Sequence, residues 1–217
     1  MTTSRNIDRA RVYRFLARIF HPPDPSKVSE VQCDDLPGLP AVLKRLGASA
    51  ELLALAKQLD ECLLNADTTS LNAEYDKAFE VSNGAERPPN ETAHAPETPQ
   101  EGLTKTYQLA DIAGFYRAFG VEVEPGSERV DHITAELEFM HYLAVKEAFA
   151  NERGETDKGE ICRDGATLFL SDHLGRWCPK LSAQLESCDP LYQAAGEFLV
   201  QFVRLDMDDR KPHSRLT

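Results

Sequence analysis

Apolar residues recur along most of the chain at the three- and four-residue spacing of an α-helix, and no stretch shows the alternation of a half-buried strand. The pattern is clearest over residues 7–20, 131–150 and 190–203. Residues with this period line one side of a helix, which must be buried against a neighbour. The sequence therefore predicts an all-α protein, an irregular helical bundle of about eight to ten helices.

Helix-breaking and capping residues predict where several helices begin and end. His21-Pro22-Pro23 ends the first helix, and a Pro-rich passage over residues 36–40 precedes a helix that Ser49 caps. Gly120 suits the left-handed residue that follows a helix, and Asp189-Pro190 supplies an N-cap followed by a first-turn proline.

The C-terminal third carries three further expectations. A helix over about residues 157–174 presents Ile161 and Leu168 among its apolar residues. Pro179 is expected to begin the next short helix, and the polar tail after Met207 is expected to fray.

The composition changes sharply over residues 83–99, where four prolines deny the backbone helical continuity. We expect this segment to connect an N-terminal lobe of residues 1–82 to a C-terminal lobe of about residues 100–207 within one helical domain. A long connector of this kind makes a domain-swapped dimer conceivable beside a monomer.

The chain is strongly acidic, with 36 acidic and 24 basic residues and a formal net charge of -12. Such a charge repels nucleic acid and anionic lipid, and it attracts a cationic segment. There is no secretory signal and no apolar run long enough to insert into a membrane. The cysteines are odd in number and scattered, which favours a reducing, cytoplasmic setting: Cys33, Cys62, Cys162, Cys178 and Cys188.

Sequence motifs for catalysis are scarce. The chain contains no phosphate-binding loop, dinucleotide fingerprint or nucleophile elbow. Glu138-x-x-His141 places a carboxylate and an imidazole on one helical face, but a four-helix di-iron site needs two such pairs, and we find one. A small metal-dependent helical enzyme using Glu138 and His141 is thus the alternative hypothesis, and we expect no metal or other cofactor.

Other polar residues lie where a binding role and a structural role are both open. Asp131-His132 precedes the longest helix, where Asp131 is expected to cap exposed amides. The segment from Pro88 to His94 is rigid and chemically mixed, which suits either peptide capture or a plain linker. Residues 169–177 place Phe169, His173 and Trp177 on one face, which favours core packing.

Five short motifs follow one another over roughly residues 70–180. They are Tyr75-x-x-x-Phe79, Pro89-x-Glu91-x-x-His94, Ala110-Asp111-Ile112-x-Gly114-Phe115-Tyr116-x-Ala118-Phe119-Gly120, Asp131-His132-Ile133-x-x-Glu136-Leu137-Glu138-Phe139-Met140 and Phe169-x-x-x-His173-Leu174-x-x-Trp177-x-Pro179. In this order they resemble the TorD/DmsD/NarJ family of redox-enzyme maturation chaperones. One departure is that the single tryptophan, Trp177, lies outside the Pro-rich segment, where some relatives carry several.

The resemblance implies a non-catalytic, all-helical chaperone, and within the family the chain looks most similar to chaperones of type II dimethyl sulfoxide reductase enzymes. Such a chaperone binds the twin-arginine leader and apo form of a molybdenum-cofactor oxidoreductase catalytic subunit, assists cofactor insertion and prevents premature export. The leader-binding positions carry over most directly to Asp131 and His132, while Tyr116, Glu91 and His94 match other motif positions. A permanent assembly subunit is a third hypothesis, and the sequence does not identify the client.

Overall fold

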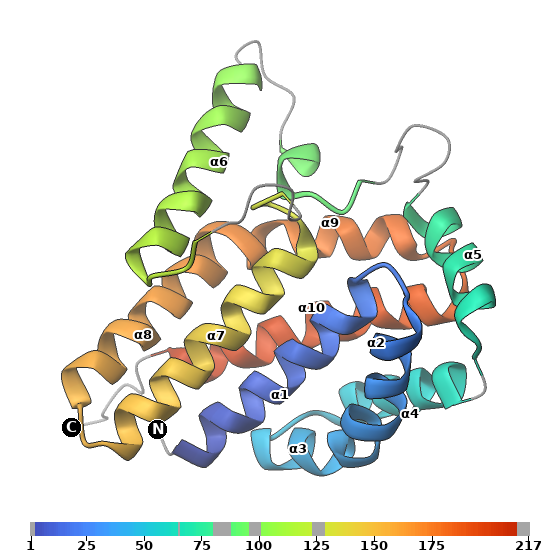
Figure 1. Cartoon of the computed structure of the whole chain (residues 1–217), viewed down its shortest axis with the longest axis horizontal. Coiled ribbons are helices and arrows are strands. Elements are labelled where there is room, and N and C mark those ends of the chain that lie inside the picture. The colour runs from blue at the N-terminus through green and yellow to red at the C-terminus, as the bar shows by residue number, and fades with distance from the viewer. Residues whose placement is uncertain (1–2, 65, 80–87, 96–100, 123–128, 212–217) are drawn as a thin grey trace.

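A computed structural model describes residues 3–64, 66–79, 88–95, 101–122 and 129–211. The regular elements in these ranges are all helical, which confirms the all-α prediction (Figure 1). The described part contains ten α-helices: α1 (Thr3–Phe20), α2 (Pro25–Glu30), α3 (Leu39–Leu46), α4 (Ala50–Leu64), α5 (Thr68–Phe79), α6 (Glu101–Ala118), α7 (Ile133–Glu152), α8 (Thr156–Phe169), α9 (Gly175–Leu185) and α10 (Pro190–Arg210). None of them combines the length and apolar character of a membrane span.

The core forms where α1 lies along α7 and where α10 packs against α4 and α9 (Figure 1). Edge-to-face aromatic pairs join α1 to α10, with ring centroids 4.9 Å apart for Tyr13 and Phe202 and 5.8 Å apart for Phe15 and Phe198. Helices from the two expected lobes therefore share one apolar core in the described part of the chain.

Local capping signals predicted several helix ends correctly. Ser49 Oγ accepts a hydrogen bond from the Leu52 amide at 3.2 Å, and Asp189 Oδ1 accepts one from the Leu191 amide at 2.9 Å. Gly120 follows α6 with a φ of 79°, a left-handed conformation that glycine adopts without steric cost.

The Pro-rich passage over residues 36–40 is helical: a 3-10 turn (Leu36–Gly38) leads into α3, and each proline occupies a first-turn position that needs no amide donor. The prediction for Pro179 was wrong. Pro179 lies inside α9 and does not begin it, because a π-helical segment (Leu170–Leu174) carries the chain from α8 into α9 without a break.

The apolar face expected on α8 was also partly wrong. Ala166 and Phe169 are buried, but Ile161 and Leu168 are 60% and 52% exposed. Helix α8 packs chiefly against α7, and the residues between α8 and α9 take π-helical geometry. Fewer apolar residues of α8 therefore face the core than the sequence pattern predicted.

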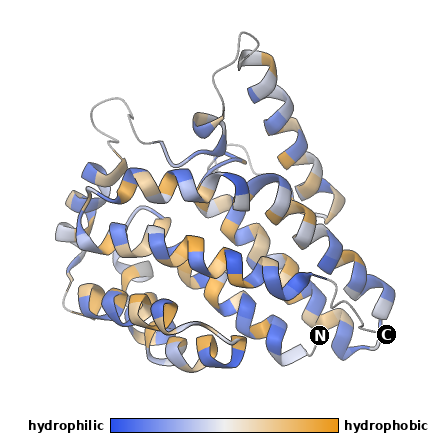
Figure 2. Cartoon of the chain, turned by 180° about the vertical axis from the view of Figure 1, so that it is seen from behind, coloured by the Kyte–Doolittle hydropathy of each residue, from blue (hydrophilic) through white to orange (hydrophobic). Residues whose placement is uncertain are grey.

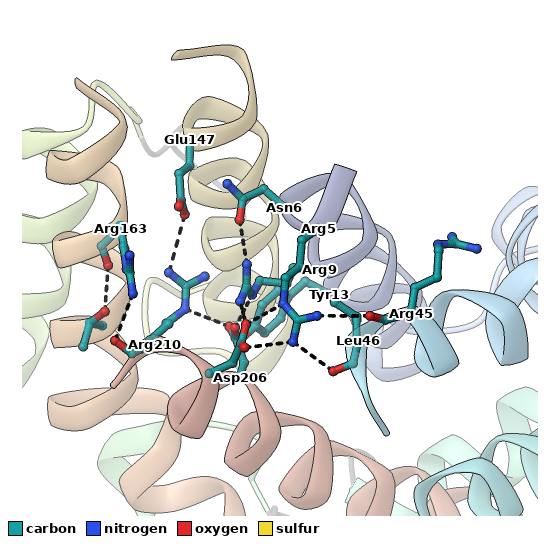
Figure 3. A network of polar contacts seen from close by, with 12 residues as sticks. Arg5, Asn6, Arg9, Tyr13, Arg45, Leu46, Glu147, Arg163, Asp206 and Arg210 are labelled. Carbon is teal, nitrogen blue, oxygen red and sulfur yellow. Dashed lines mark hydrogen bonds and ion pairs between the residues drawn. The ribbon is translucent and has the colours of Figure 1, made fainter. Parts of the chain in front are cut away.

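Helix α10 continues to Arg210, whose side chain is buried, contrary to the fraying expected after Met207; residues 212–217 of that tail lie outside the described residues. Asp206 accounts for this difference (Figure 3). Its carboxylate accepts hydrogen bonds from Arg9 Nε at 2.5 Å, Tyr13 Oη at 2.7 Å and Arg210 Nε at 3.1 Å. Burial alone would raise the pKa of Asp206, but the guanidinium groups of Arg210 and Arg9 outweigh it and hold that pKa below its ordinary value.

Breaking this buried ionic network should destabilise the whole bundle. Asp206→Asn removes the negative charge that separates two buried guanidinium groups, so we expect the free energy of unfolding to fall by about 3–5 kcal/mol. Urea-induced unfolding followed by circular dichroism measures the change. Glu61→Gln, in an exposed pair with Lys57 on α4, is the matched control and should leave the midpoint unchanged. Equal midpoints for the two variants would show that the network contributes little to stability.

Candidate functional site

The described part of the Pro-rich segment, residues 88–95, folds back onto the N-terminal end of α7. The Glu91 amide donates to the Asp131 carbonyl at 2.8 Å, and the Ile133 amide donates to the Pro89 carbonyl at 2.8 Å. Residues 91–94 then form a 3-10 turn (Glu91–His94). These backbone hydrogen bonds hold the segment against the bundle across about forty residues of sequence, so this part of it is an attached loop. Hereafter we call residues 88–95 the attached loop.

Asp131 holds this loop through its side chain. Its fully buried carboxylate accepts hydrogen bonds from Thr92 Oγ1 at 2.6 Å, the Thr92 amide at 3.2 Å and Asn90 Nδ2 at 3.3 Å. Arg129, whose side chain is 60% exposed, adds contacts from Nε at 3.0 Å and Nη2 at 3.2 Å. The carboxylate of Asp131 is therefore already paired with an arginine of the same chain.

The helix cap expected at Asp131 is instead at His132. The first residue of α7 is Ile133, and the Nδ1 atom of His132 accepts a hydrogen bond from the Thr134 amide at 3.3 Å. Asp131 is one residue too early to cap the helix, which leaves its carboxylate directed at the attached loop. His132 is itself buried, with 6% of its surface exposed.

A second polar cluster lies on the other side of the attached loop, around Glu91. His173 Nδ1 lies 3.1 Å from Glu91 Oε2, and Gln108 Nε2 donates to Glu91 Oε1 at 2.6 Å. The other ring nitrogen of His173 lies 3.3 Å from Asp111 Oδ2. Glu91 and His173 are buried, so this chain of contacts runs from the interior outward to Asp111, whose side chain is 65% exposed.

Glu136 lies beneath this cluster, one turn into α7, and is fully buried. Trp177 Nε1 donates to its Oε2 atom at 2.9 Å, while its Oε1 atom has no hydrogen-bond partner. Burial, followed by the nearby charge of Glu91, raises the pKa of Glu136 well above its ordinary value. In the folded chain the charged form of Glu136 is thus disfavoured, and its one printed hydrogen bond comes from Trp177.

His94 and Tyr116 complete the surroundings of the loop. The His94 ring stacks on Trp177 with centroids 5.1 Å apart, and burial lowers the pKa of its imidazole. Tyr116 Oη donates to the Val130 carbonyl at 2.8 Å, which ties α6 to the residue before Asp131. All five residues that the resemblance singled out thus lie around the attached loop and the start of α7, and all are buried.

The buried partners of these residues were not predicted from the sequence. The core position expected for Trp177 and His173 is confirmed, but their hydrogen bonds to Glu136 and Glu91 join residues 41 and 82 positions apart. Glu136 belonged to a motif, and the motif gave no sign that its side chain is buried.

Glu138 and His141, the two residues of the alternative metal hypothesis, have different surroundings in the structure. His141 Nδ1 lies 2.8 Å from the Ala10 carbonyl, which links α7 to α1, whereas Glu138 is exposed. Within the described ranges, no group of three or more histidine, cysteine, aspartate or glutamate side chains is arranged to hold a metal ion. The arrangement of Glu138 and His141 gives the metal hypothesis no support.

Glu136→Gln should change how stability depends on pH. The folded chain keeps a proton on Glu136 that the unfolded chain loses above the ordinary pKa of 4.5, so the free energy of unfolding falls as pH rises from 4.5 through the folded pKa. Glutamine cannot ionise, and the variant should lack this fall and be more stable than the wild type at the alkaline end. Urea unfolding between about pH 5 and pH 8 tests this, with exposed Glu138→Gln as the control. Parallel pH profiles for wild type and Glu136→Gln would contradict the assignment.

Comparison with known proteins places this site in a family. The sequence model described as nitrate reductase delta subunit matches residues 47–183, which include the attached loop, α6 and α7. A solved protein of Archaeoglobus fulgidus, assigned by name to redox enzyme maturation, shares the fold with a TM-score of 0.53 and 18% identity, covering 90% of this chain and 93% of that one.

Three relatives are named as assembly chaperones. The selenate reductase assembly chaperone of Thauera selenatis is 32% identical over 62% of this chain and 67% of its own. The chlorate reductase assembly chaperone of Ideonella dechloratans is 30% identical over 67% and 75%. The perchlorate reductase assembly chaperone of Dechloromonas aromatica is 32% identical over 53% of this chain and 46% of its own, so the match spans less than half of that relative. The chain belongs to the nitrate reductase delta subunit family, the family of redox-enzyme maturation chaperones that its motifs resemble.

Proposed function

We propose that this chain is a cytoplasmic, non-catalytic assembly chaperone for the catalytic subunit of a molybdenum-cofactor oxidoreductase. It binds the subunit's twin-arginine leader and apo form, assists cofactor insertion and prevents premature export. The observation that carries the proposal is the match to three relatives named for the assembly of selenate, perchlorate and chlorate reductases. All three clients reduce oxyanions, which favours a client of the same chemical class.

Charge supports a cationic partner. The net charge of -12 draws a basic segment toward the protein and raises the rate at which the two meet. A twin-arginine leader offers two guanidinium groups followed by an apolar helix, and guanidinium groups pair with carboxylates through two parallel hydrogen bonds. An acidic helical protein with exposed apolar residues complements both parts of such a leader.

The five residues taken from the resemblance act in this proposal as the frame of the leader-binding region. Asp131 and His132 fix the attached loop and the start of α7, and Glu91, His94 and Tyr116 join the loop to the neighbouring helices. Asp131 affects leader binding through the loop that it holds, because its carboxylate is buried and paired with Arg129. A binding surface on a rigid frame loses little entropy when the leader binds.

A chaperone differs from a permanent assembly subunit in leaving the finished enzyme. The proposal therefore places the chain on the apo form of the client and excludes it from the active oxidoreductase. Equal stoichiometry of the chain and the catalytic subunit in the active enzyme would instead favour a permanent subunit. The chain acts as a monomer or as a domain-swapped dimer, two states that light scattering at high protein concentration separates.

Leader binding is tested by isothermal titration of the full-length chain with a synthetic peptide that carries two arginines and an apolar helix. We expect saturable binding that weakens with added salt, and at least about a tenfold loss of affinity when glutamine replaces both arginines. Equal affinity for the two peptides would remove the proposed role of the arginines. Absence of binding to both peptides and to the client apoprotein would remove the chaperone assignment.

Asp131→Asn tests the frame. Asparagine keeps one oxygen acceptor for Thr92 but loses the charge that pairs with Arg129, so we expect the leader affinity to fall by roughly 1–3 kcal/mol. Asp164→Asn, an exposed position on α8, is the control and should bind as the wild type does. Unchanged affinity in a folded Asp131→Asn variant would show that the loop does not contribute to binding.

A further inference from the structure

An open depression lies between α6 and the π-helical segment that joins α8 to α9. The N-terminal half of α6 stands away from the rest of the bundle (Figure 1), and apolar and polar residues alternate along the helix (Figure 2). Tyr107 is 73% exposed and Leu103 is 62% exposed on this half. The depression has a volume of about 790 Å³ and is lined by Tyr107 and Asp111 of α6 and by Asp172, His173 and Arg176 opposite them.

The floor of the depression is a buried group directed outward. His173 is 2% exposed and is held from below by Glu91, 3.1 Å from Nδ1. Its Nε2 atom has no hydrogen-bond partner, although Asp111 Oδ2 lies 3.3 Å away. A buried polar atom without a partner is costly, so this nitrogen marks the point at which a ligand or an ordered water would complete the site.

The charged residues around the depression favour a ligand with a positive charge. Asp111 and Asp172 lie on its rim and Glu91 lies beneath it, against one guanidinium group from Arg176. The exposed Asp111 carboxylate is free to accept two parallel hydrogen bonds from a guanidinium group while its second contact remains His173. Tyr107 and Leu103 supply an aromatic and an aliphatic surface beside it, on which a cation or an apolar side chain packs.

We infer that this depression is the docking surface for the arginine-bearing end of the client leader, with Asp111 as the guanidinium acceptor and Tyr107 as the apolar wall. The inference rests on the proposed function and names a surface for it. The five frame residues lie next to this surface and are buried, whereas Asp111 and Tyr107 are accessible. The frame positions the floor of the depression through the contact between Glu91 and His173.

The test compares Asp111→Asn and Tyr107→Ala with the wild type in titrations with the two-arginine peptide. Asparagine keeps an oxygen near His173 and removes the charge, so we expect a roughly five- to tenfold weaker affinity and a shallower dependence of affinity on salt. Loss of the tyrosine ring should weaken binding by a similar factor without changing the salt dependence. Asp60→Asn, an exposed aspartate on α4, is the matched control and should bind as the wild type does.

A photo-crosslinking residue placed beside the second arginine of the peptide gives an independent readout. Crosslinks to residues 104–111 and 172–176 would support the surface, and crosslinks to residues 129–132 would overturn it. Wild-type affinity and salt dependence in both variants would also overturn the surface while leaving the proposed function intact. Failure of the wild type to bind the peptide would instead count against the proposed function itself.

Discussion

The buried carboxylate of Asp206 is the interaction on which the arrangement of the bundle depends. It lies between two guanidinium groups, from Arg9 on α1 and Arg210 on the same helix, α10, and it accepts the hydroxyl of Tyr13 (Figure 3). A buried charge tolerates little displacement of its partners, because each lost contact leaves an uncompensated ion. The network therefore fixes α10 against α1, and α1 in turn lies along α7. Charges at the opposite end of α7 therefore help to position the helix whose N-terminal end carries the candidate site.

At the N-terminal end of α7 two further buried carboxyl groups, those of Asp131 and Glu136, hold neighbouring segments together. Asp131 accepts hydrogen bonds from three donors besides Arg129, whereas burial and the nearby charge of Glu91 raise the pKa of Glu136 well above its ordinary value. Asp131 thus holds the attached loop directly, and Glu136 holds Trp177, on which His94 of the loop stacks. The hydrogen bonds of both groups come from the same chain, which suits a positioning role better than a reaction with a substrate.

Features that depend on a few neighbouring residues were predictable from the sequence. Helical period, the Ser49 cap, the Asp189-Pro190 start and the left-handed Gly120 all follow from local sterics and hydrogen bonding. The resemblance also identified residues that lie together around the attached loop. What could not be predicted were contacts between distant segments: Asp131 meets Thr92 across 39 positions, and Arg210 of α10 pairs with Glu147 of α7. The π-helical segment likewise depends on tertiary packing. Because it was not predicted, the expected helix start at Pro179 and the expected burial of Leu168 were both wrong.

The outer half of α6 adds little to the core, although its inner half is anchored by Ile112 and Tyr116. Side chains such as Tyr107 and Leu103 are therefore under few packing constraints, and replacing them costs the fold little. Because only the inner half of α6 is anchored in the core, substitutions on its outer half can change which client is bound without disturbing the buried polar frame. Divergence among such chaperones would then accumulate on this projecting surface ahead of the interior, at almost no expense in stability.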